Sequence, residues 1–264
     1  MPRVCQVVRV FTRDGEGGNH LGVINDVIGL DAAGMQAIAT DLGFSETVFI
    51  EWDEGAIPYV RIFTPAAELP FAGHPLVGTA WTMLTMGPGG IDQLACGIGP
   101  VDVGVEGDTA WIRAPLDPAN SSEMELADYA LRTGMPVPQR AWLVHIPSDY
   151  VILEYEDAAT VAAVAPEADA LSEYHGTMVF ARDGSLVRAR FFAPDLGVYE
   201  DPATGSAAVA WATAMTATGE SQGAVTIHQG EEVGFPSEIA LSWDGTSARI
   251  GGSCVRDEVR FLDD

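Results

Sequence analysis

The sequence predicts a mixed α/β protein whose chain consists of two related halves. Two observations support this fold class: strand-like and helix-like segments alternate along the chain, and one long segment is repeated. Residues 61–74, RIFTPAAELPFAGH, match residues 190–206, RFFAPDLGVYEDPATGS, when an insertion of three residues is allowed. Each copy continues into a small, apolar, helix-like run. Each half is therefore predicted to contain a strand, a second strand, a turn and a buried helix.

The first half begins with the strand-like segment CQVVRVF, residues 5–11. Residues 32–43, AAGMQAIATDLG, predict a helix of about three turns that stops at Gly43, because glycine readily adopts the left-handed conformation that ends helices. The segments SETVFI and YVRIFTP then predict two strands. Residues 100–115, PVDVGVEGDTAWIRAP, predict a hairpin with its turn at Gly107-Asp108.

The boundary between the halves is placed in PLDPANSSEME, residues 115–125, because this stretch is polar and rich in proline. The predicted domains are residues 1–118 and 119–249, with the tail 250–264 as a candidate addition to the first. In the second half, WLVHIPSDYVILEY is strand-rich, and DAATVAAVAPEADAL predicts a helix broken at Pro166. The last 25 residues before Asp263 predict strands joined by turns, one of them at Asp244-Gly245.

Composition limits the function classes. Lys and Arg number 13 against 38 Asp and Glu, so the formal charge is −25, which disfavours nucleic acid and anionic membranes as partners. All 13 basic residues are arginine, which excludes Schiff-base, pyridoxal-phosphate and phosphate-loop lysines. The three cysteines form no CxxC pair, and no apolar run reaches the ~18 residues that a bilayer requires. The expected setting is cytoplasmic, with no signal peptide.

The repeated turn predicts a site for an anion. A glycine at the start of a helix lets a ligand approach the free N–H groups of the first turn, and the helix dipole favours negative charge there. The first copy offers Gly73 and His74, and the second offers Gly205 and Ser206. Two such helix starts facing each other would bind a small carboxylated metabolite. Ordinary helix capping remains the alternative for either turn alone.

Three further side chains are candidates for moving or holding a proton. Glu46 is predicted to share the core-facing side of a strand with Phe44 and Val48, which would raise its pKa towards neutrality and suit it to acid/base work. His74 stands at the predicted anion site, where an imidazole can donate a hydrogen bond or carry a proton. Asp201 could orient His74 or hold the substrate. The alternatives are a solvent-facing strand end for Glu46 and capping roles for the other two.

With these residues assembled, the chain resembles the phenazine-biosynthesis PhzF-like proteins of the diaminopimelate-epimerase-like superfamily. The resemblance spans nearly the whole chain and rests on four ordered motifs, VFTRDGEGGNHLGVI, FSETVFI, RIFTPAAELPFAGHPLVGTA and RFFAPDLGVYEDPATGSAAVA. It implies two pseudo-symmetric domains, each a bent mixed sheet or barrel around a central helix, with the active site between them. It also implies a homodimeric isomerase or epimerase that uses neither a metal nor an organic cofactor.

Carried over residue by residue, the resemblance makes Glu46 the catalytic acid/base, with His74 and Asp201 as its catalytic partners. It implies that the substrate-binding positions are Asn19, Ser45, Gly73, Gly205 and Ser206. The superfamily's racemases instead use two cysteines in the corresponding turns, where this chain has His74 and Ser206. A two-thiol racemase is therefore disfavoured.

Two other functions remain open at this point. The first is a non-catalytic protein that binds a small carboxylate in a retained pocket. The second is a hydrolase with Ser206, His74 and Asp201 as a triad, although TGSAA is not the G-x-S-x-G elbow. The histidines lack a metal-binding spacing such as HExxH, so no metal ligands are assigned, while the many acids leave a cation site open.

Overall fold

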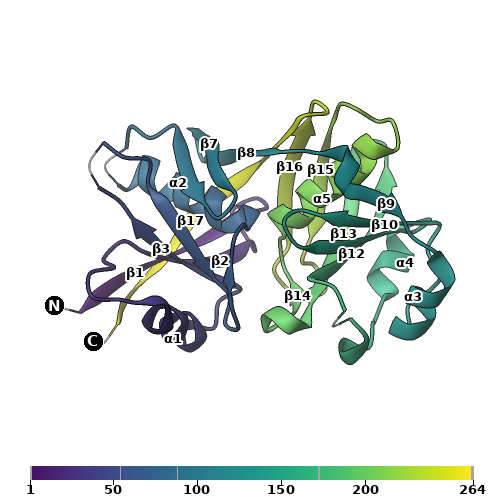
Figure 1. Ribbon diagram of the computed structural model, residues 1–264, viewed down its shortest axis with the longest axis horizontal. Coiled ribbons are helices and arrows are strands. Elements are labelled where there is room, and N and C mark those ends of the chain that lie inside the picture. The colour runs from purple at the N-terminus through teal and green to yellow at the C-terminus, as the bar shows by residue number, and fades with distance from the viewer. Residues whose placement is uncertain (1, 54, 88, 172, 263–264) are drawn as a thin grey trace.

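The computed structural model describes residues 2–53, 55–87, 89–171 and 173–262. Figure 1 shows two lobes side by side, joined where β8 and β17 run between them, with the two termini close together on the first lobe. The mixed α/β class predicted from the sequence is confirmed, and the sheet is continuous across both lobes.

The strands of the first lobe close into a barrel. Neighbouring strands pair in the order β1–β2–β3–β4–β6–β7–β8–β17, and β17 returns to pair with β1. The elements of this lobe are β1 (Arg3–Thr12), β2 (Asn19–Ile24), α1 (Ala32–Leu42), β3 (Glu46–Glu51), β4 (Tyr59–Phe63), β5 (Glu68–Leu69), α2 (Gly73–Thr85), β6 (Gln93–Cys96), β7 (Gly99–Glu106) and β8 (Thr109–Pro115).

The second lobe repeats this pairing pattern. The parallel pair β2–β3 recurs as β11–β12, and the parallel pair β4–β6 recurs as β13–β15. The elements are β9 (Ser121–Glu123), α3 (Leu126–Thr133), β10 (Arg140–His145), β11 (Asp149–Glu154), α4 (Ala158–Ala163), β12 (Gly176–Asp183), β13 (Leu186–Ala193), β14 (Val198–Asp201), α5 (Gly205–Ala217), β15 (Gly223–Gln229), β16 (Ser237–Trp243) and β17 (Ser247–Leu262). The sequence repeat is therefore a structural repeat.

One long strand, β17, ties the lobes together. Its first residues pair with β16 of the second lobe and with β8 of the first, and its remainder pairs with β1. Strand β17 forms hydrogen bonds with strands of both lobes. The domain boundaries proposed from the sequence therefore stay a prediction.

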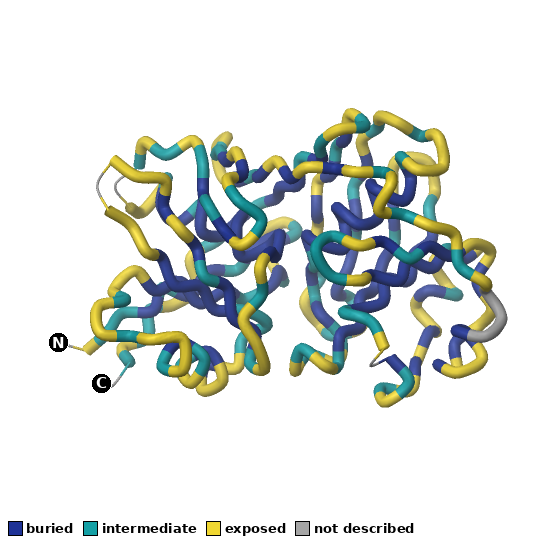
Figure 2. The backbone as a smooth tube through the Cα atoms, in the orientation of Figure 1, coloured by how far each residue is buried: buried dark blue, intermediate teal, exposed yellow. Residues whose placement is uncertain are grey.

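A buried helix occupies the centre of each lobe. In α2 and α5 nearly every residue of the first two turns is buried, and their sequences are apolar all round, as expected of helices enclosed by sheet. Figure 2 shows the buried backbone concentrated in the middle of each lobe. One cluster of buried apolar side chains, including Leu76, Trp211 and Ile250, extends through both centres. The two central helices are thus fixed by the same core.

The matching Arg and Glu of the repeat form equivalent ion pairs. Arg61 of β4 donates two hydrogen bonds of 2.7 Å to Glu68, and Arg190 of β13 donates bonds of 2.9 and 2.8 Å to Glu200. Each pair ties a strand to the short segment that leads into a central helix. The second pair is buried, with side chains 8% and 6% exposed, and Arg190 also donates to the last carbonyls around α4.

Most of the predicted elements are present, with differences at the edges. Helix α1 is followed by Gly43 in the left-handed conformation, as expected. Asp31 is its N-cap, and the Asp31 carboxylate accepts a hydrogen bond from the Gly34 N–H. The predicted break at Pro166 is wrong in position, because α4 already stops at Ala163. A short 3₁₀ turn at Ala168–Ala170 follows it.

The two equivalent ion pairs predict unequal effects on stability. Glu200→Gln removes the carboxylate that is hydrogen-bonded to the buried Arg190 guanidinium and leaves only Glu232, 3.8 Å from Nε, as its acidic neighbour. The cost should approach the ~3–5 kcal/mol of a broken buried pair. Glu68→Gln, the matched control, loosens a half-exposed pair and costs about 0–1 kcal/mol. Urea unfolding of both variants measures the difference. Equal losses would show that burial of the second pair has no energetic consequence.

Candidate functional site

The N-termini of the two central helices meet at the interface between the lobes. A methyl group built on Gly73 would lie 2.7 Å from the Cα of Gly205, and one built on Gly205 would lie 2.9 Å from the Cα of Gly73. The side chain of Ile250 fills the remaining space beside both. Only glycine permits this backbone-to-backbone contact, which explains why both copies of the repeat carry it.

Neither helix start is capped by a side chain. The N-cap residues are Ala72 for α2 and Thr204 for α5, and neither accepts a hydrogen bond from the first turn through its side chain. No acidic residue stands in either first turn. The structure therefore shows no side-chain capping at the N-terminus of either helix. Both helices present the positive ends of their dipoles to the same space.

Glu46 is the first residue of β3 and lies beside this space. Its side chain is 12% exposed, and Oε2 lies 3.2 Å from Nδ1 of His74, although no described group donates to it in hydrogen-bonding geometry. Burial, reinforced by the charge of Asp201, raises the pKa of Glu46 well above its usual range. The carboxyl group is therefore suited to exchanging a proton near neutral pH.

His74, the second residue of α2, is a neutral imidazole. Burial lowers its pKa to about 3, despite an opposing effect from the backbone of His20. Nδ1 lies 3.3 Å from the amide nitrogen of Asn19, while Nε2 has no hydrogen-bond partner among the described residues. Nδ1 is thus the ring nitrogen beside the Glu46 carboxyl, and the buried Nε2 has unused hydrogen-bonding capacity.

Asp201 is held by groups from both lobes. Its carboxylate accepts from Asn19 Nδ2 at 2.8 Å and from Thr204 Oγ1 at 2.6 Å, and it also accepts from Ser45. Asn19 and Ser45 belong to the first lobe, and Asp201 and Thr204 to the second. Burial nevertheless raises the pKa of Asp201 to about 6, because these hydrogen bonds offset only part of the desolvation.

Two aromatic residues that sequence reasoning did not assign complete the second-lobe wall. Tyr150 of β11 shares a hydrogen bond with the Ser206 side chain, and burial raises the pKa of its phenol. The ring of His175 lies 5.0 Å from that of Tyr150. Their only sequence signal is position: Tyr150 is the second residue of β11, and His175 directly precedes β12.

Some of these side chains line a small cavity, the reaction cavity, with about 20 Å³ of free space; Asn19, His74 and Tyr150 are not among its lining residues. That is room for roughly one water molecule. Its lining residues include Ser45, Glu46, Ala72, His175, Asp201, Thr204 and Ser206. Because a metabolite is much larger than one water, entry requires the lobes or the lining segments to separate.

The candidate residues are thus brought together, with one correction. Phe44 does not share the core side of β3 with Glu46 and Val48, because it precedes the strand and lines a different cavity. Strand β3 is buried on both faces from Thr47 to Ile50, so the simple alternation expected for a half-buried strand does not apply. The apolar surroundings of Glu46 come from the lobe interface instead.

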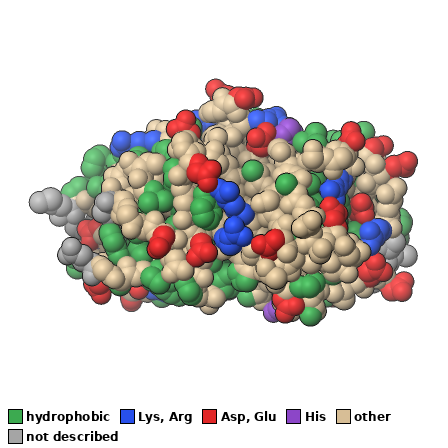
Figure 3. Space-filling model, turned by 90° about the horizontal axis from the view of Figure 1, so that it is seen from above, with side chains coloured by type: hydrophobic (Ala, Val, Ile, Leu, Met, Phe, Trp, Pro, Cys, Tyr) green, Lys and Arg blue, Asp and Glu red, His purple; other side chains and the backbone are tan. Residues whose placement is uncertain are grey.

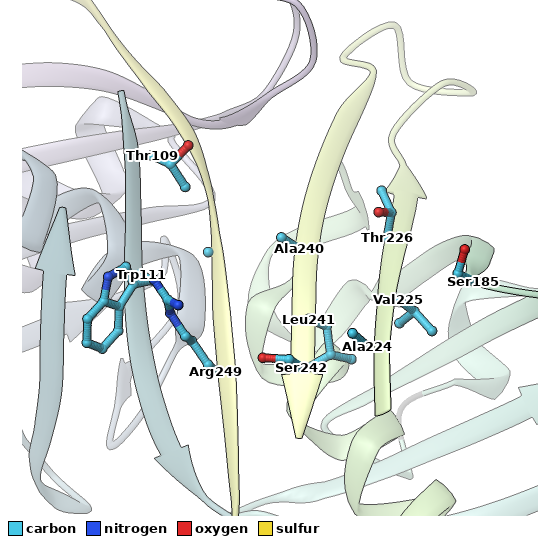
Figure 4. Close-up of a pocket in the computed structure, with 11 residues that line it drawn as sticks. Thr109, Trp111, Ser185, Ala224, Val225, Thr226, Ala240, Leu241, Ser242 and Arg249 are labelled. Atoms are coloured by element: carbon cyan, nitrogen blue, oxygen red, sulfur yellow. The ribbon is translucent and has the colours of Figure 1, made fainter. Parts of the chain in front are cut away.

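A wider groove lies elsewhere between the lobes, across β8, β15, β16 and β17 (Figure 4). It has about 470 Å³ of space and is floored by small side chains such as Ala224, Ala240 and Ser242. Trp111 and Arg249 lie on its first-lobe side (Figure 4), with the guanidinium 4.3 Å from the ring centre. Its lining contains no carboxylate or imidazole, so it offers no proton carrier.

Other features of the described chain bear on the expected partners. Figure 3 shows a face on which acidic side chains are widely scattered and arginines lie beside them in several places. In the part of the chain that the structure describes, no group of three or more His, Cys, Asp or Glu side chains is arranged to hold a metal ion. Nor does any described helix combine the length and apolar character needed to cross a membrane.

Two pseudo-symmetric α/β lobes, with uncapped helix starts meeting at their interface, define the class: a protein of the diaminopimelate-epimerase-like fold. The sequence matches the family of phenazine biosynthesis-like proteins over residues 8–256. The chain therefore belongs to this family, and the resemblance predicted from its motifs is confirmed.

Similar proteins agree with this assignment. The chain is 34% identical to an uncharacterized isomerase of Mesorhizobium japonicum, with 94% of each chain covered. It is 31% identical to trans-2,3-dihydro-3-hydroxyanthranilate isomerase of Pseudomonas fluorescens, covering 88% of this chain and 87% of that one. A PhzF-family phenazine biosynthesis protein of Enterococcus faecalis shares the fold, with a TM-score of 0.83, 23% identity and full coverage of both chains. The predicted enzyme class, an isomerase, is confirmed.

The contact between the helix starts predicts that a single methyl group is damaging. Gly205→Ala places a carbon within 2.9–3.0 Å of the Gly73 backbone, which cannot move independently of α2. We expect a loss of about 1–3 kcal/mol in the free energy of unfolding, as for other overpacked sites. Gly34→Ala, in the first turn of α1, is the control: its methyl group would meet only the Leu30 and Asp31 side chains, at 3.2 and 3.4 Å, so a smaller effect is expected. Thermal unfolding of the two variants measures the effect. A Gly205→Ala variant as stable as the wild type would contradict the contact between the two helix starts.

The raised pKa of Asp201 predicts a pH dependence of stability. Between about pH 4 and pH 6 the folded protein holds a proton that the unfolded chain has lost, because its pKa moves from 3.8 to about 6. The contribution is complete below pH 4 and is lost as pH rises through 6. Relative to Asp201→Asn, the wild type should therefore lose stability over that interval in urea unfolding. A difference in unfolding free energy between the two proteins that does not vary with pH would contradict the raised pKa of Asp201.

Proposed function

We propose that this protein is a cofactor-independent isomerase that moves a proton on a small carboxylated metabolite, with Glu46 as the acid and base. The observation that carries the proposal is the buried Glu46 carboxyl beside two uncapped helix starts. The similarity to the Pseudomonas isomerase supports the reaction class. The substrate is expected to be amino-acid-like or cyclic, bound in the reaction cavity of each subunit of a cytoplasmic homodimer.

The substrate's carboxylate would bind at the N-termini of α2 and α5. The free N–H groups near Gly73 and Gly205 would donate to it, and the dipole ends would stabilise its charge. Arginine and lysine play no part there, because the lining of the reaction cavity contains neither. A carboxylate held by such donors withdraws electrons from the adjacent carbon, which acidifies its C–H bond.

Proton transfer would then proceed in two steps. The Glu46 carboxylate takes the proton as the C–H bond breaks, and the electron pair remains on the substrate, delocalised towards the bound carboxylate. In a substrate with a C=C bond next to that carbon, the electron pair also extends over this bond. Glu46 then returns the proton to the far carbon, where a new C–H bond forms as the double bond shifts. No oxidant, reductant or co-reactant is consumed, and the carboxyl group ends in its starting state.

His74, Asp201 and Ser206 would hold the substrate during these steps. Neutral His74 can donate or accept through Nε2 without introducing a charge, and Ser206 is oriented by its hydrogen bond with Tyr150. Asn19 links His74 and Asp201, so the two catalytic partners of Glu46 are positioned by one amide. The described contacts of His74 include Glu46 and Asn19 but not Ser206, which speaks against the Ser206–His74–Asp201 triad of a hydrolase.

The proposal predicts loss of proton exchange in Glu46→Gln. The amide keeps the shape of the side chain but no longer takes a proton, so exchange of carbon-bound hydrogen with heavy water should fall by about 10²–10⁴-fold for any substrate that the wild type accepts. Glu51→Gln, at the exposed far end of β3, is the control and should retain full exchange. A panel of cyclic and linear amino acids, followed by NMR, provides the substrates.

Two outcomes would count against the proposal. Full exchange in Glu46→Gln would show that another group carries the proton. Tight carboxylate binding by the wild type, with no exchange on any member of the panel, would favour the non-catalytic binding protein.

A further inference from the structure

A second cavity, the outer compartment, adjoins the reaction cavity. Its walls include His20, Phe44, Ser45, Val198 and Phe235, and it has about 220 Å³ of space. We propose that it binds an aromatic substituent of the substrate, so that the substrate is a carboxylate extended by an aryl side chain. This inference rests on the proposed function, because the reacting end of the molecule must lie at Glu46.

The two cavities are separated by a thin polar partition. Ser45 and Val198 line both of them, and Asn19, on the outer side, donates to Asp201 on the inner side at 2.8 Å. The partition also contains the Ser45–Asp201 hydrogen bond between the lobes. A ligand whose polar atoms replace these bonds could therefore extend from one cavity into the other when the lobes separate.

Three aromatic rings form the wall of the outer compartment. The ring of His20 stacks on that of Phe44, with centroids 5.9 Å apart and planes 10° from parallel. Phe235 meets His20 edge to face, with centroids 5.6 Å apart and planes at 84°. Aromatic walls in these two orientations favour a flat ring as the ligand. Space on the order of 150 Å³ holds one benzene molecule, so a single aryl ring fits.

The aromatic wall is assembled from both lobes. His20 and Phe44 come from the first lobe, and Phe235 comes from the turn between β15 and β16 in the second. That turn is fixed to the first lobe, because the Gly18 N–H donates to the Pro236 carbonyl at 3.3 Å. The three rings would therefore keep their arrangement as the lobes separate to admit a substrate.

The charged side chains around the compartment already have partners, which favours a neutral substituent: Arg260 Nε, for example, lies 2.6 Å from Glu258. His20 Nε2 lies 3.3 Å from Asp257, and the Arg260 guanidinium lies 4.6 Å from the ring centre of Phe44. Glu200, the acid of the lining, is held by Arg190. A second carboxylate or an ammonium group on the ligand would have to displace one of these partners. The wider groove of Figure 4 shares no lining residue with the reaction cavity and is not an alternative.

Isothermal titration calorimetry with 4-phenylbutanoate and butanoate tests this inference. We expect the wild type to bind the phenyl compound at least tenfold more tightly, and Phe235→Ala to reduce this preference to less than threefold while leaving butanoate affinity unchanged. Phe235 lies on the surface, 39% exposed, so the variant should fold. Phe44→Leu is a second variant with the same expectation. Phe261→Ala, at a 69% exposed phenylalanine on β17, is the matched control and should keep the preference.

The outcomes separate this inference from the proposed function. Equal affinity for the two compounds, or a preference unchanged in both Phe235→Ala and Phe44→Leu, would overturn the aryl site, whatever the result of the exchange assay. A preference lost in Phe235→Ala, together with no hydrogen exchange on any substrate, would support the aryl site and reject the isomerase. Absence of binding for both compounds would overturn the site.

Discussion

The backbone contact between Gly73 and Gly205 is the constraint on which the rest of the structure depends. It brings two helix N-termini together with almost no side chain between them, so their free N–H groups and dipole ends act on one small space. The contact requires both helices to be buried and held at a fixed depth in their lobes. The closed barrel around α2, the related sheet around α5, and the shared strand β17 meet that requirement.

The positive ends of the helices lie in a molecule of net charge −25. Within the site, however, the acids are Glu46 and Asp201, both buried and both with raised pKa. The charge of Asp201 adds to the effect of burial on Glu46, so ionised Asp201 disfavours ionisation of Glu46. Burial therefore disfavours the charged form of both carboxyl groups in the site. His74 adds hydrogen-bonding capacity and no charge.

The pseudo-symmetry of the lobes is preserved in the scaffold and broken in the chemistry. Both lobes keep the Arg–Glu pair and the glycine at the start of the central helix. Their functional side chains differ: His74 stands where the other copy has Ser206, and Glu46 has no acidic counterpart near Thr177. With Glu46 as the one proposed proton carrier, the scaffold fits proton movement along one face of a substrate more directly than inversion, which uses groups on two opposite faces.

The sequence alone determined the mixed α/β class, the two related halves and the list of candidate residues. It could do so because the repeat, the glycines at the helix starts and the four motifs are patterns of residues that lie near one another in the sequence. Tertiary structure decided what those residues meet. The environment of Glu46 arises at the lobe interface and not from alternation along β3, so the predicted role of Phe44 was wrong. Tyr150, His175 and the ring of His20 carry no local signal, because their importance comes from contacts across strands and lobes that are distant in sequence. Local structure can be predicted from residues that are close in sequence. Burial, pKa values and the walls of a cavity depend on how distant parts of the folded chain pack together.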